Sequence, residues 1–228
     1  MIPKWEKIPD CIKNKFVKKY YDYIILKKNS LILKRVFDIL ASIILIIILL
    51  IPMIIISFAI KISSKGSILY KQKRVTQYGK EFFILKFRTM QENSDKSGFL
   101  TCNNDKRVTK IGKILRKFRL DEFPQLINIL VGDMTFVGTR PEVPKYTKKY
   151  TDEMLATLIL PAGVTSISSV NFRNEDKYLA NSLDSDKIYL DKILPEKMKY
   201  NLEYLINFNF FLDIKILFLT VLKVFKIF

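Results

Sequence analysis

The sequence predicts an α+β fold, mainly helical, that combines a membrane-embedded segment with one small globular domain. Ile39–Ile60 runs for 22 residues without a charge, which is roughly 33 Å as a straight helix against a hydrocarbon core of about 30 Å. Two later segments rich in β-branched and aromatic residues flank a short turn and indicate a β-hairpin. The other regular patterns are helical, and 228 residues suit one domain plus a membrane element.

Residues 1–33 form an N-terminal extension to which we assign no chemistry. They combine Trp5 and several tyrosines with many lysines. An interfacial helix and a solvated extension packed on the globular part are both compatible with this composition. The apolar run that follows begins too far into the chain, and lacks a small-residue cleavage site, for a cleaved signal peptide.

The apolar segment is long enough to cross a membrane, but two features favour a different path. Pro52 lies a little past its middle, and a proline inside a helix removes a hydrogen bond and bends the axis. Basic residues flank both ends, with Lys34 before and Lys61 after, and basic flanks mark the cytoplasmic side. A helix–break–helix hairpin over residues 34–61, with Pro52 at the break, enters and leaves the same leaflet and satisfies both observations.

The globular domain is expected over residues 62–204 and begins with the β-hairpin. Its predicted strands are Ser67–Arg74 and Glu81–Phe87. Lys86 and Arg88 are two residues apart, so on a strand they point to one face and can bind a diphosphate together. A solvated strand face is the alternative.

A helix is predicted immediately after Asp121 and Glu122. Pro124 fits its first turn, Gln125–Val131 continues it with mainly apolar residues, and Gly132 ends it. The start of a helix carries unpaired N–H groups and a partial positive charge. This position therefore suits an anion or a metal-bound phosphate.

Asp121 and Glu122 are adjacent carboxylates that can hold one metal ion. Mg²⁺ is usually bound by one or two carboxylates together with phosphate oxygens. Arg116, Arg119 and Arg140 can neutralise those phosphates. An acid pair before a helix also serves simply as a cap, and that alternative remains open at this point.

The rest of the domain is expected to be mostly helical. A basic helix at Lys113–Arg119 leads to the acid pair. Val143–Leu158 is predicted as a helix, Val164–Asn174 as a turn and a short strand, and Pro195–Tyr204 as a further helix.

Residues 205–228 are predicted to form an interfacial amphipathic segment. The last 16 residues are apolar but include Lys215, Lys223 and Lys226, so they are too short and too charged to span a membrane. A terminal helix packed in the core is the alternative.

The motifs, in their order, resemble those of the bacterial sugar transferases, also called monotopic phosphoglycosyl transferases. LDEFPQLINILVGDM and VGTRPE carry the resemblance around the acid pair. It extends over most of the chain through the KRVFD that starts at Lys34, the KFRTM that starts at Lys86, the PAGVT that starts at Pro161 and the NFRN that starts at Asn171.

The resemblance implies a phosphotransferase that moves a sugar-1-phosphate from a UDP-sugar to polyprenyl (undecaprenyl) phosphate and releases UMP. In that family the Asp of the acid pair is the nucleophile, so Asp121 would form a covalent aspartyl-phosphosugar intermediate, with Mg²⁺ held largely by Glu122. The candidate substrate-binding residues are Lys86, Arg88, Arg107, Arg116, Arg119, Arg140, Asn171 and Arg173.

The same resemblance implies a place in the cell. It suggests a re-entrant membrane hairpin in the bacterial cytoplasmic (inner) membrane, with the catalytic domain at residues 62–204 on the cytoplasmic face. The product would start a cell-surface glycan, such as a capsule, an exopolysaccharide, an O-antigen or a glycoprotein glycan. A non-catalytic membrane adaptor or scaffold of glycan assembly is the alternative from another functional class.

Two positions depart from the family pattern. Relatives commonly have Ser before the proline of the hairpin, where this chain has Ile51. Many relatives read close to PGITGWAQVNGRN where this chain reads PAGVTSISSVNFRN, so the Gly-Trp part is missing while Asn171 and Arg173 remain. This difference bears on which sugar is accepted.

Composition narrows the partners and the chemistry. Lys and Arg number 39 against 22 acids, a formal charge of +17, which indicates an anionic partner. Because the basic residues lie beside apolar segments and no nucleic-acid-binding motif is present, anionic membrane lipids and sugar nucleotides fit better than nucleic acid. The chain has no histidine, which excludes imidazole as a base or ligand. Its two cysteines weakly favour a reducing cytoplasmic setting.

Overall fold

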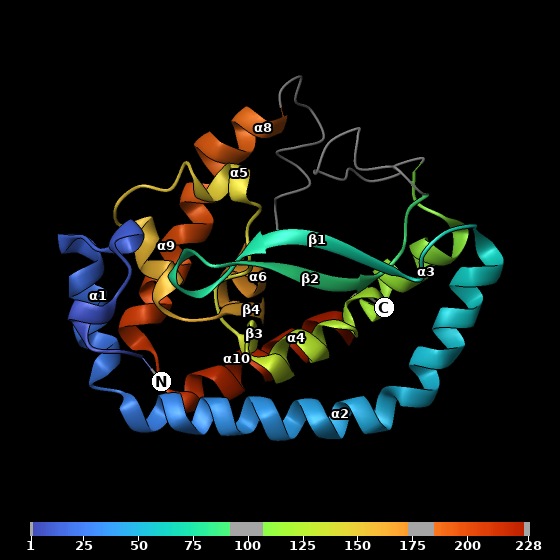
Figure 1. The fold of residues 1–228 in the computed structure, drawn as a ribbon, viewed down its shortest axis with the longest axis horizontal. Helices are drawn as coiled ribbons and strands as arrows, with labels where there is room; N and C mark the ends of the chain where they lie inside the picture. Colours follow the sequence, from blue (N-terminus) through green and yellow to red (C-terminus); the bar gives the residue numbers. More distant parts are fainter. Residues whose placement is uncertain (1, 92–106, 173–184, 226–228) are drawn as a thin grey trace.

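A computed structural model of the protein describes residues 2–91, 107–172 and 185–225. One long helix, α2 (Lys28–Ser63), runs along one edge of the molecule, and the β-hairpin lies across its middle (Figure 1). The α-helices are α1 (Lys15–Ile25), α2, α3 (Lys110–Lys117), α4 (Gln125–Val131), α5 (Pro144–Thr147), α6 (Ile167–Asn171), α8 (Ser185–Ile188), α9 (Leu194–Asn207) and α10 (Phe210–Phe225). The strands are β1 (Leu69–Val75), β2 (Glu81–Phe87), β3 (Met134–Val137) and β4 (Ala162–Thr165).

Helix α2 continues through Pro52, which corrects the predicted helix–break–helix. Figure 1 shows that its last part turns away from the axis of the first part, so the chain bends here without an interruption. A bend is the ordinary effect of a proline inside a helix, because one backbone hydrogen bond is lost and the others persist. In the described part of the chain, α2 is the one helix long and apolar enough to cross a membrane, and large side chains such as Ile47 and Ile51 are exposed on it.

Three charged residues at the start of α2 hold the globular domain. Arg35 donates from Nη1 to the carbonyl oxygen of Ile129 at 2.7 Å and from Nη2 to that of Leu130 at 2.9 Å. A cation at the end of a helix compensates its unpaired carbonyl groups and its dipole, so Arg35 caps α4. Asp38 accepts hydrogen bonds from the Thr135 hydroxyl at 2.6 Å and from the Phe136 N–H at 3.1 Å, and both donors lie on β3.

Lys34 makes the third of these attachments through a buried ion pair with α10. Its Nζ lies 2.6 Å from Asp213 Oδ2 and 2.6 Å from the carbonyl oxygen of Val137, the last residue of β3. The Tyr204 hydroxyl donates to the other oxygen of Asp213 at 2.6 Å. Lys34 and Asp213 are 5% and 3% exposed, so this polar group is satisfied within the protein rather than by solvent.

The predicted hairpin is confirmed. Strands β1 and β2 pair in antiparallel register from Leu69 with Phe87 to Val75 with Glu81. The turn between them contains Tyr78 and Gly79 with positive φ angles of 61° and 76°.

A second, parallel pair of strands, β3 with β4, was not predicted. Two glycines allow the strands to approach this closely, because a Cβ atom on Gly163 would clash with the Gly138 nitrogen at 2.2 Å. The turn and short strand predicted over Val164–Asn174 are confirmed only in part: β4 ends at Thr165 and helix α6 follows. Ser166 starts that helix because its hydroxyl accepts a hydrogen bond from the Ser169 N–H at 3.0 Å.

The predicted helix at Val143–Leu158 is also wrong. The chain forms the short α5 and then a 3-10 turn at Met154–Ile159. Ala156 and Ile159 are fully buried in the main core, so tertiary burial outweighs local helix propensity here. The helix predicted at Pro195–Tyr204 is confirmed as α9.

Both ends of the chain pack on the domain. Val17 and Ile24 on α1 are fully buried in the main core, which supports the packed alternative for the N-terminal extension. On α10, Ile216 is fully buried while Phe211 and Phe218 are 81% and 62% exposed. This helix is therefore packed on one face, as the core alternative expected, and apolar on its exposed face, as expected for an interfacial helix.

We expect the pair Lys34 and Asp213 to dominate the attachment of α2. Lys34→Met and Asp213→Leu should each lower the free energy of unfolding in detergent micelles by about 3–5 kcal/mol, because each leaves one buried charge without its partner. The double variant should lose clearly less than the sum of the two, as a double-mutant cycle would report. Disrupting the exposed pair Lys199 and Glu196 should change little. Additive losses at Lys34 and Asp213 would contradict a coupled pair.

Candidate active site

The acid pair lies in the short turn that connects helices α3 and α4. Helix α3 begins at the cap residue Thr109, whose hydroxyl accepts from the Gly112 N–H at 2.9 Å. Gly112 lies so close to the end of the hairpin that a Cβ atom there would be 2.0 Å from the Thr89 carbonyl oxygen. After α3, Arg119 adopts a left-handed conformation with φ 58°. The following turn, Leu120–Glu122, leads directly into α4.

Glu122 joins three basic residues from different parts of the chain. Its Oε1 lies 2.5 Å from Arg140 Nη2, 3.2 Å from Lys86 Nζ and 3.7 Å from Arg119 Nη1. The side chain is 10% exposed. Burial by itself would raise the pKa of Glu122, but the charges of Arg140, Lys86 and Arg119 lower it below its ordinary value. Glu122 is therefore held as a carboxylate.

Asp121 has the opposite environment. It is 8% exposed, and its Oδ1 is buried with no hydrogen-bond partner among the described residues. Burial raises the pKa of Asp121 above its ordinary value, the negative charge of Glu122 adds to the rise, and Lys86 and the nearby arginines offset part of it. A buried carboxylate oxygen without a partner is costly, and such groups are typical of functional sites.

The other predicted residues divide into those near the acid pair and those elsewhere. Arg116 donates from Nε to the Thr89 hydroxyl at 2.9 Å, and its charge acts on Asp121. Arg88 is 6% exposed and donates to Ser64, both to its carbonyl oxygen at 2.8 Å and to its hydroxyl at 2.9 Å. Because Lys86 contacts Glu122 instead, the structure does not bring Lys86 and Arg88 together as predicted.

For the remaining three predicted residues, no side-chain contact with the acid pair is seen in the described part of the chain. Arg107 accepts a hydrogen bond from the Gln91 N–H through its carbonyl oxygen at 2.9 Å. Asn171 is exposed at the end of α6. Arg173 lies outside the described residues.

A large cleft opens beside Glu122, with a volume of about 1110 Å³. Its charged lining is mainly basic, and its apolar lining includes Leu45 and Leu49 of α2. The basic residues are Arg74, Lys117, Arg119, Arg140, Lys197 and Lys223, and the acidic ones are Glu122 and Glu142. A cleft with this charge and an apolar side that includes α2 suits an amphiphilic anion.

Sequence reasoning missed several residues that line this cleft. Arg74 on β1 and Lys197 and Asn201 on α9 were not singled out, and neither was Gln125. The side chain of Gln125 is 1% exposed, and its Nε2 has no partner among the residues that the structure describes. The position of Gln125, three residues after Glu122, was the one available signal. The others come from elements that only the fold brings to the site.

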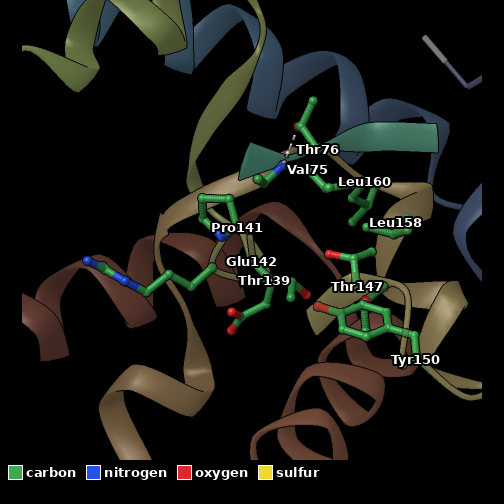
Figure 2. A pocket seen from close by; sticks show the side chains of 12 residues that line it. Val75, Thr76, Thr139, Pro141, Glu142, Thr147, Tyr150, Leu158 and Leu160 are labelled. Atoms are coloured by element: carbon green, nitrogen blue, oxygen red, sulfur yellow. Dashed lines mark hydrogen bonds between the residues drawn. The ribbon is translucent and has the colours of Figure 1, made fainter. Parts of the chain in front are cut away.

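Strand β1 holds the segment that carries Arg140 in place. Arg74 donates from Nη1 to the Pro141 carbonyl oxygen at 3.0 Å, and the Val75 N–H donates to the Glu142 carbonyl oxygen at 2.9 Å. Figure 2 shows Glu142, Thr139, Thr147 and Tyr150 around a small void behind this segment. The void measures about 10 Å³, room for about one water molecule, so it supports the segment and is not a substrate site.

The two carboxylates can supply part of the coordination of a divalent cation, with the remaining positions filled by oxygens of a ligand. In residues 2–91, 107–172 and 185–225, no group of three or more His, Cys, Asp or Glu side chains can hold a metal. Asp121 nevertheless offers an unpartnered oxygen beside Glu122. This donor set matches Mg²⁺, which keeps water and takes phosphate oxygens in addition to one or two carboxylates.

Comparison with known proteins gives one family. Residues 29–227 match the model of the bacterial sugar transferase family. The chain is 34% identical over 194 residues, 85% of its length, to the uncharacterized sugar transferase EpsL of Bacillus subtilis, of which the match covers 88%.

Two relatives have names that state a reaction. The chain is 35% identical over 201 residues to a UDP-glucose:undecaprenyl-phosphate glucose-1-phosphate transferase of Klebsiella pneumoniae. It is 33% identical over 193 residues to a UDP-N-acetylgalactosamine-undecaprenyl-phosphate N-acetylgalactosaminephosphotransferase of Aeromonas hydrophila. These matches cover 85% and 83% of this chain but only 40% and 43% of the relatives.

The two carboxylates should titrate in opposite directions from their ordinary values. We expect Asp121 to be half protonated above pH 3.8, at a pH where Glu122 is still ionised. Glu122→Gln should lower the midpoint of Asp121, because it removes a neighbouring negative charge and leaves the basic residues unneutralised. Carboxyl ¹³C NMR shifts measure both midpoints, and Asp133→Asn serves as the control. An unchanged Asp121 midpoint in Glu122→Gln would show that Glu122 does not act on it, and a higher midpoint would contradict the predicted direction.

Proposed function

Because the chain belongs to the bacterial sugar transferase family, we propose that it transfers a sugar-1-phosphate from a UDP-sugar to undecaprenyl phosphate. Relatives named for this reaction support the general chemistry. We further propose that the reaction proceeds through a covalent intermediate on Asp121 and starts a cell-surface glycan.

The observation that carries the proposal is the contrast between the two carboxylates. Glu122 is neutralised by Arg140, Lys86 and Arg119, whereas Asp121 Oδ1 has no partner in residues 2–91, 107–172 and 185–225. A carboxylate oxygen without a hydrogen bond has not been stabilised as an anion and remains available for attack. The cations around Glu122 supply positive charge where a diphosphate would react.

In the first step Asp121 Oδ1 attacks the β-phosphorus of the donor. The bond from this phosphorus to the bridging oxygen breaks, and UMP leaves with that oxygen and the electron pair. In the second step an oxygen of the lipid phosphate attacks the same phosphorus and the bond to Asp121 breaks, which restores the carboxylate. No imidazole is needed, in agreement with a chain that has no histidine.

Mg²⁺ is the proposed cofactor, held by Glu122 and Asp121. When bound, it would neutralise charge on the phosphate groups of the donor. Arg140 remains joined to Glu122 at 2.5 Å and to the Val164 carbonyl oxygen at 2.9 Å, so this arginine keeps its orientation through two separate contacts. Its planar fork suits a phosphate better than the ammonium of a lysine does.

A re-entrant position of α2 in the cytoplasmic membrane completes the proposal, with the globular domain on the cytoplasmic face. The exposed apolar side chains of α2 and of α10 support contact with lipid. Lys34, Arg35 and Asp38 bond to the domain, so the first part of α2 lies close to the catalytic side of the membrane. A non-catalytic adaptor would have no use for an unpartnered carboxylate beside a basic cleft.

Asp121→Asn should abolish both turnover and the covalent adduct, because the amide keeps the size of the side chain but removes the nucleophile. Intact-protein mass spectrometry after mixing with a UDP-sugar alone should find an added phosphosugar on the native protein only. Glu122→Gln should form the adduct slowly, with a weaker dependence on Mg²⁺. Asp152→Asn, on the surface, is the control. An adduct on Asp121→Asn, or an active native protein that never forms one, would favour direct attack by the lipid phosphate.

Cysteines at the two ends of α2 should be equally protected in intact cells. In a background without Cys11 and Cys102, Asn29→Cys and Lys65→Cys should both resist a membrane-impermeant thiol reagent, because a re-entrant segment keeps both ends in the cytoplasm. Both sites should react after permeabilisation, which controls for burial. Labelling of one site alone in intact cells would establish that α2 spans the membrane.

A further inference from the structure

One wall of the cleft is built from polar groups that the reaction proposed above does not use. Helix α6 packs against α9 and α10, and Ser168, Asn201 and Thr220 from these three helices all line the cleft. Thr220 links the wall to β4, since its hydroxyl lies 2.8 Å from that of Thr165 at the end of this strand. The wall is therefore a defined surface with hydroxyl and amide groups on it.

Asn201 is the unusual member of this wall. It is 3% exposed, yet the only hydrogen bond of its side chain within the described part of the chain runs from Nδ2 to Met198 Sδ at 3.9 Å. A thioether is a weak acceptor, and a side-chain amide has two donors and an acceptor to satisfy. Buried amides normally have strong partners, so Asn201 retains hydrogen-bonding capacity that a ligand in the cleft can use.

Ser168 adds a hydroxyl beside it. It is 3% exposed, and its hydroxyl lies 2.9 Å from that of Ser166, the residue that caps α6. Because Ser166 also lies 2.8 Å from the exposed Ser169, the three hydroxyls form a chain that can exchange donor and acceptor roles. Such a group adapts to either a hydroxyl or an amide on a ligand.

Arg140 connects this wall to the reacting carboxylates. It donates from Nη2 to Glu122 and from Nη1 to the carbonyl oxygen of Val164 at 2.9 Å, and Ser168 follows only four residues later. A sugar attached to a phosphate held at Arg140 therefore has the α6–α9 wall within reach. Val170, Phe172 and Met198 on the same wall offer apolar contact to a sugar ring.

We propose that Ser168 and Asn201 form the subsite that binds the sugar of the donor and that they determine which sugar is transferred. This inference rests on the proposed function. The physical basis of selection is that a site with buried polar groups rejects a donor that leaves those groups unpaired. Selection therefore depends on the position of the hydroxyl or acetamido groups of the sugar.

The test compares donors in the full-length protein. UDP-glucose, UDP-galactose, UDP-N-acetylglucosamine and UDP-N-acetylgalactosamine are assayed with undecaprenyl phosphate for the native protein, Asn201→Leu and Ser168→Ala. For the preferred donor, kcat/KM should fall at least tenfold in Asn201→Leu, and its advantage over the other donors should shrink. The inhibition constant for UMP should change less than twofold, because UMP carries no sugar. Asn207→Leu, exposed on the same helix, should behave like the native protein.

Each other outcome has a defined meaning. An equal loss for all donors, or weaker inhibition by UMP in parallel, would overturn the sugar subsite and assign Asn201 to packing or to the nucleoside. Unchanged selectivity in both variants would overturn it as well. Calorimetric binding of the preferred UDP-sugar against UMP gives a reading that does not need turnover. A native protein that binds UDP-sugars more tightly than UMP but transfers none would contradict the proposed function while leaving the subsite standing.

Discussion

The ion cluster at Glu122 is the interaction on which the active site depends. One carboxylate oxygen contacts Lys86 from the hairpin, Arg119 from the turn before α4 and Arg140 from the segment after β3. Three segments far apart in the sequence thus meet at Glu122, whose own side chain is only 10% exposed although that of Arg119 is 63% exposed. Charges in such a place interact strongly, and removing one of them would leave the others uncompensated. The cluster sets the geometry of the site before any ligand arrives.

The same cluster explains why its neighbour differs so much. Glu122 forms ion pairs with Arg140, Lys86 and Arg119. Asp121 keeps a buried oxygen that accepts no hydrogen bond in the described part of the chain. Two adjacent acids therefore acquire opposite pKa shifts from their surroundings. Glu122 is held as a carboxylate, and Asp121 is the group on which we propose the chemistry. This division is a recurring way to assign different roles to two carboxylates of the same kind.

The membrane helix and the active site are parts of one hydrogen-bonded structure. Lys34 donates to the last residue of β3. The residue that follows β3 is Gly138, and the chain continues from there to Arg140. Arg35 caps α4, at whose other end the acid pair lies. A displacement of α2 relative to the domain would thus be transmitted to both sides of the site. The position of α2 relative to the acid pair is consequently built into the fold rather than left to a flexible linker.

Local sequence patterns determined a good part of this protein. The apolar run, the hairpin, α4 between Pro124 and Gly132, and α9 could all be predicted, because periodicity, proline and glycine act over a few residues. The acid pair and Arg140 were identified as candidates in the same way, aided by the family resemblance. The helix at Val143–Leu158, and most of the turn and short strand at Val164–Asn174, were mispredicted because burial in the core or a serine cap decided the backbone.

Only the tertiary structure decided which charges meet. No pattern indicates that Glu122 takes Lys86 and Arg140 as partners while Arg88 turns to Ser64, or that Asn201 on α9 lines the same cleft. These contacts join residues distant in sequence, and their strength depends on how much water the packed elements exclude. Local propensity acts between neighbours along the chain, whereas desolvation and ion pairing act between neighbours in space.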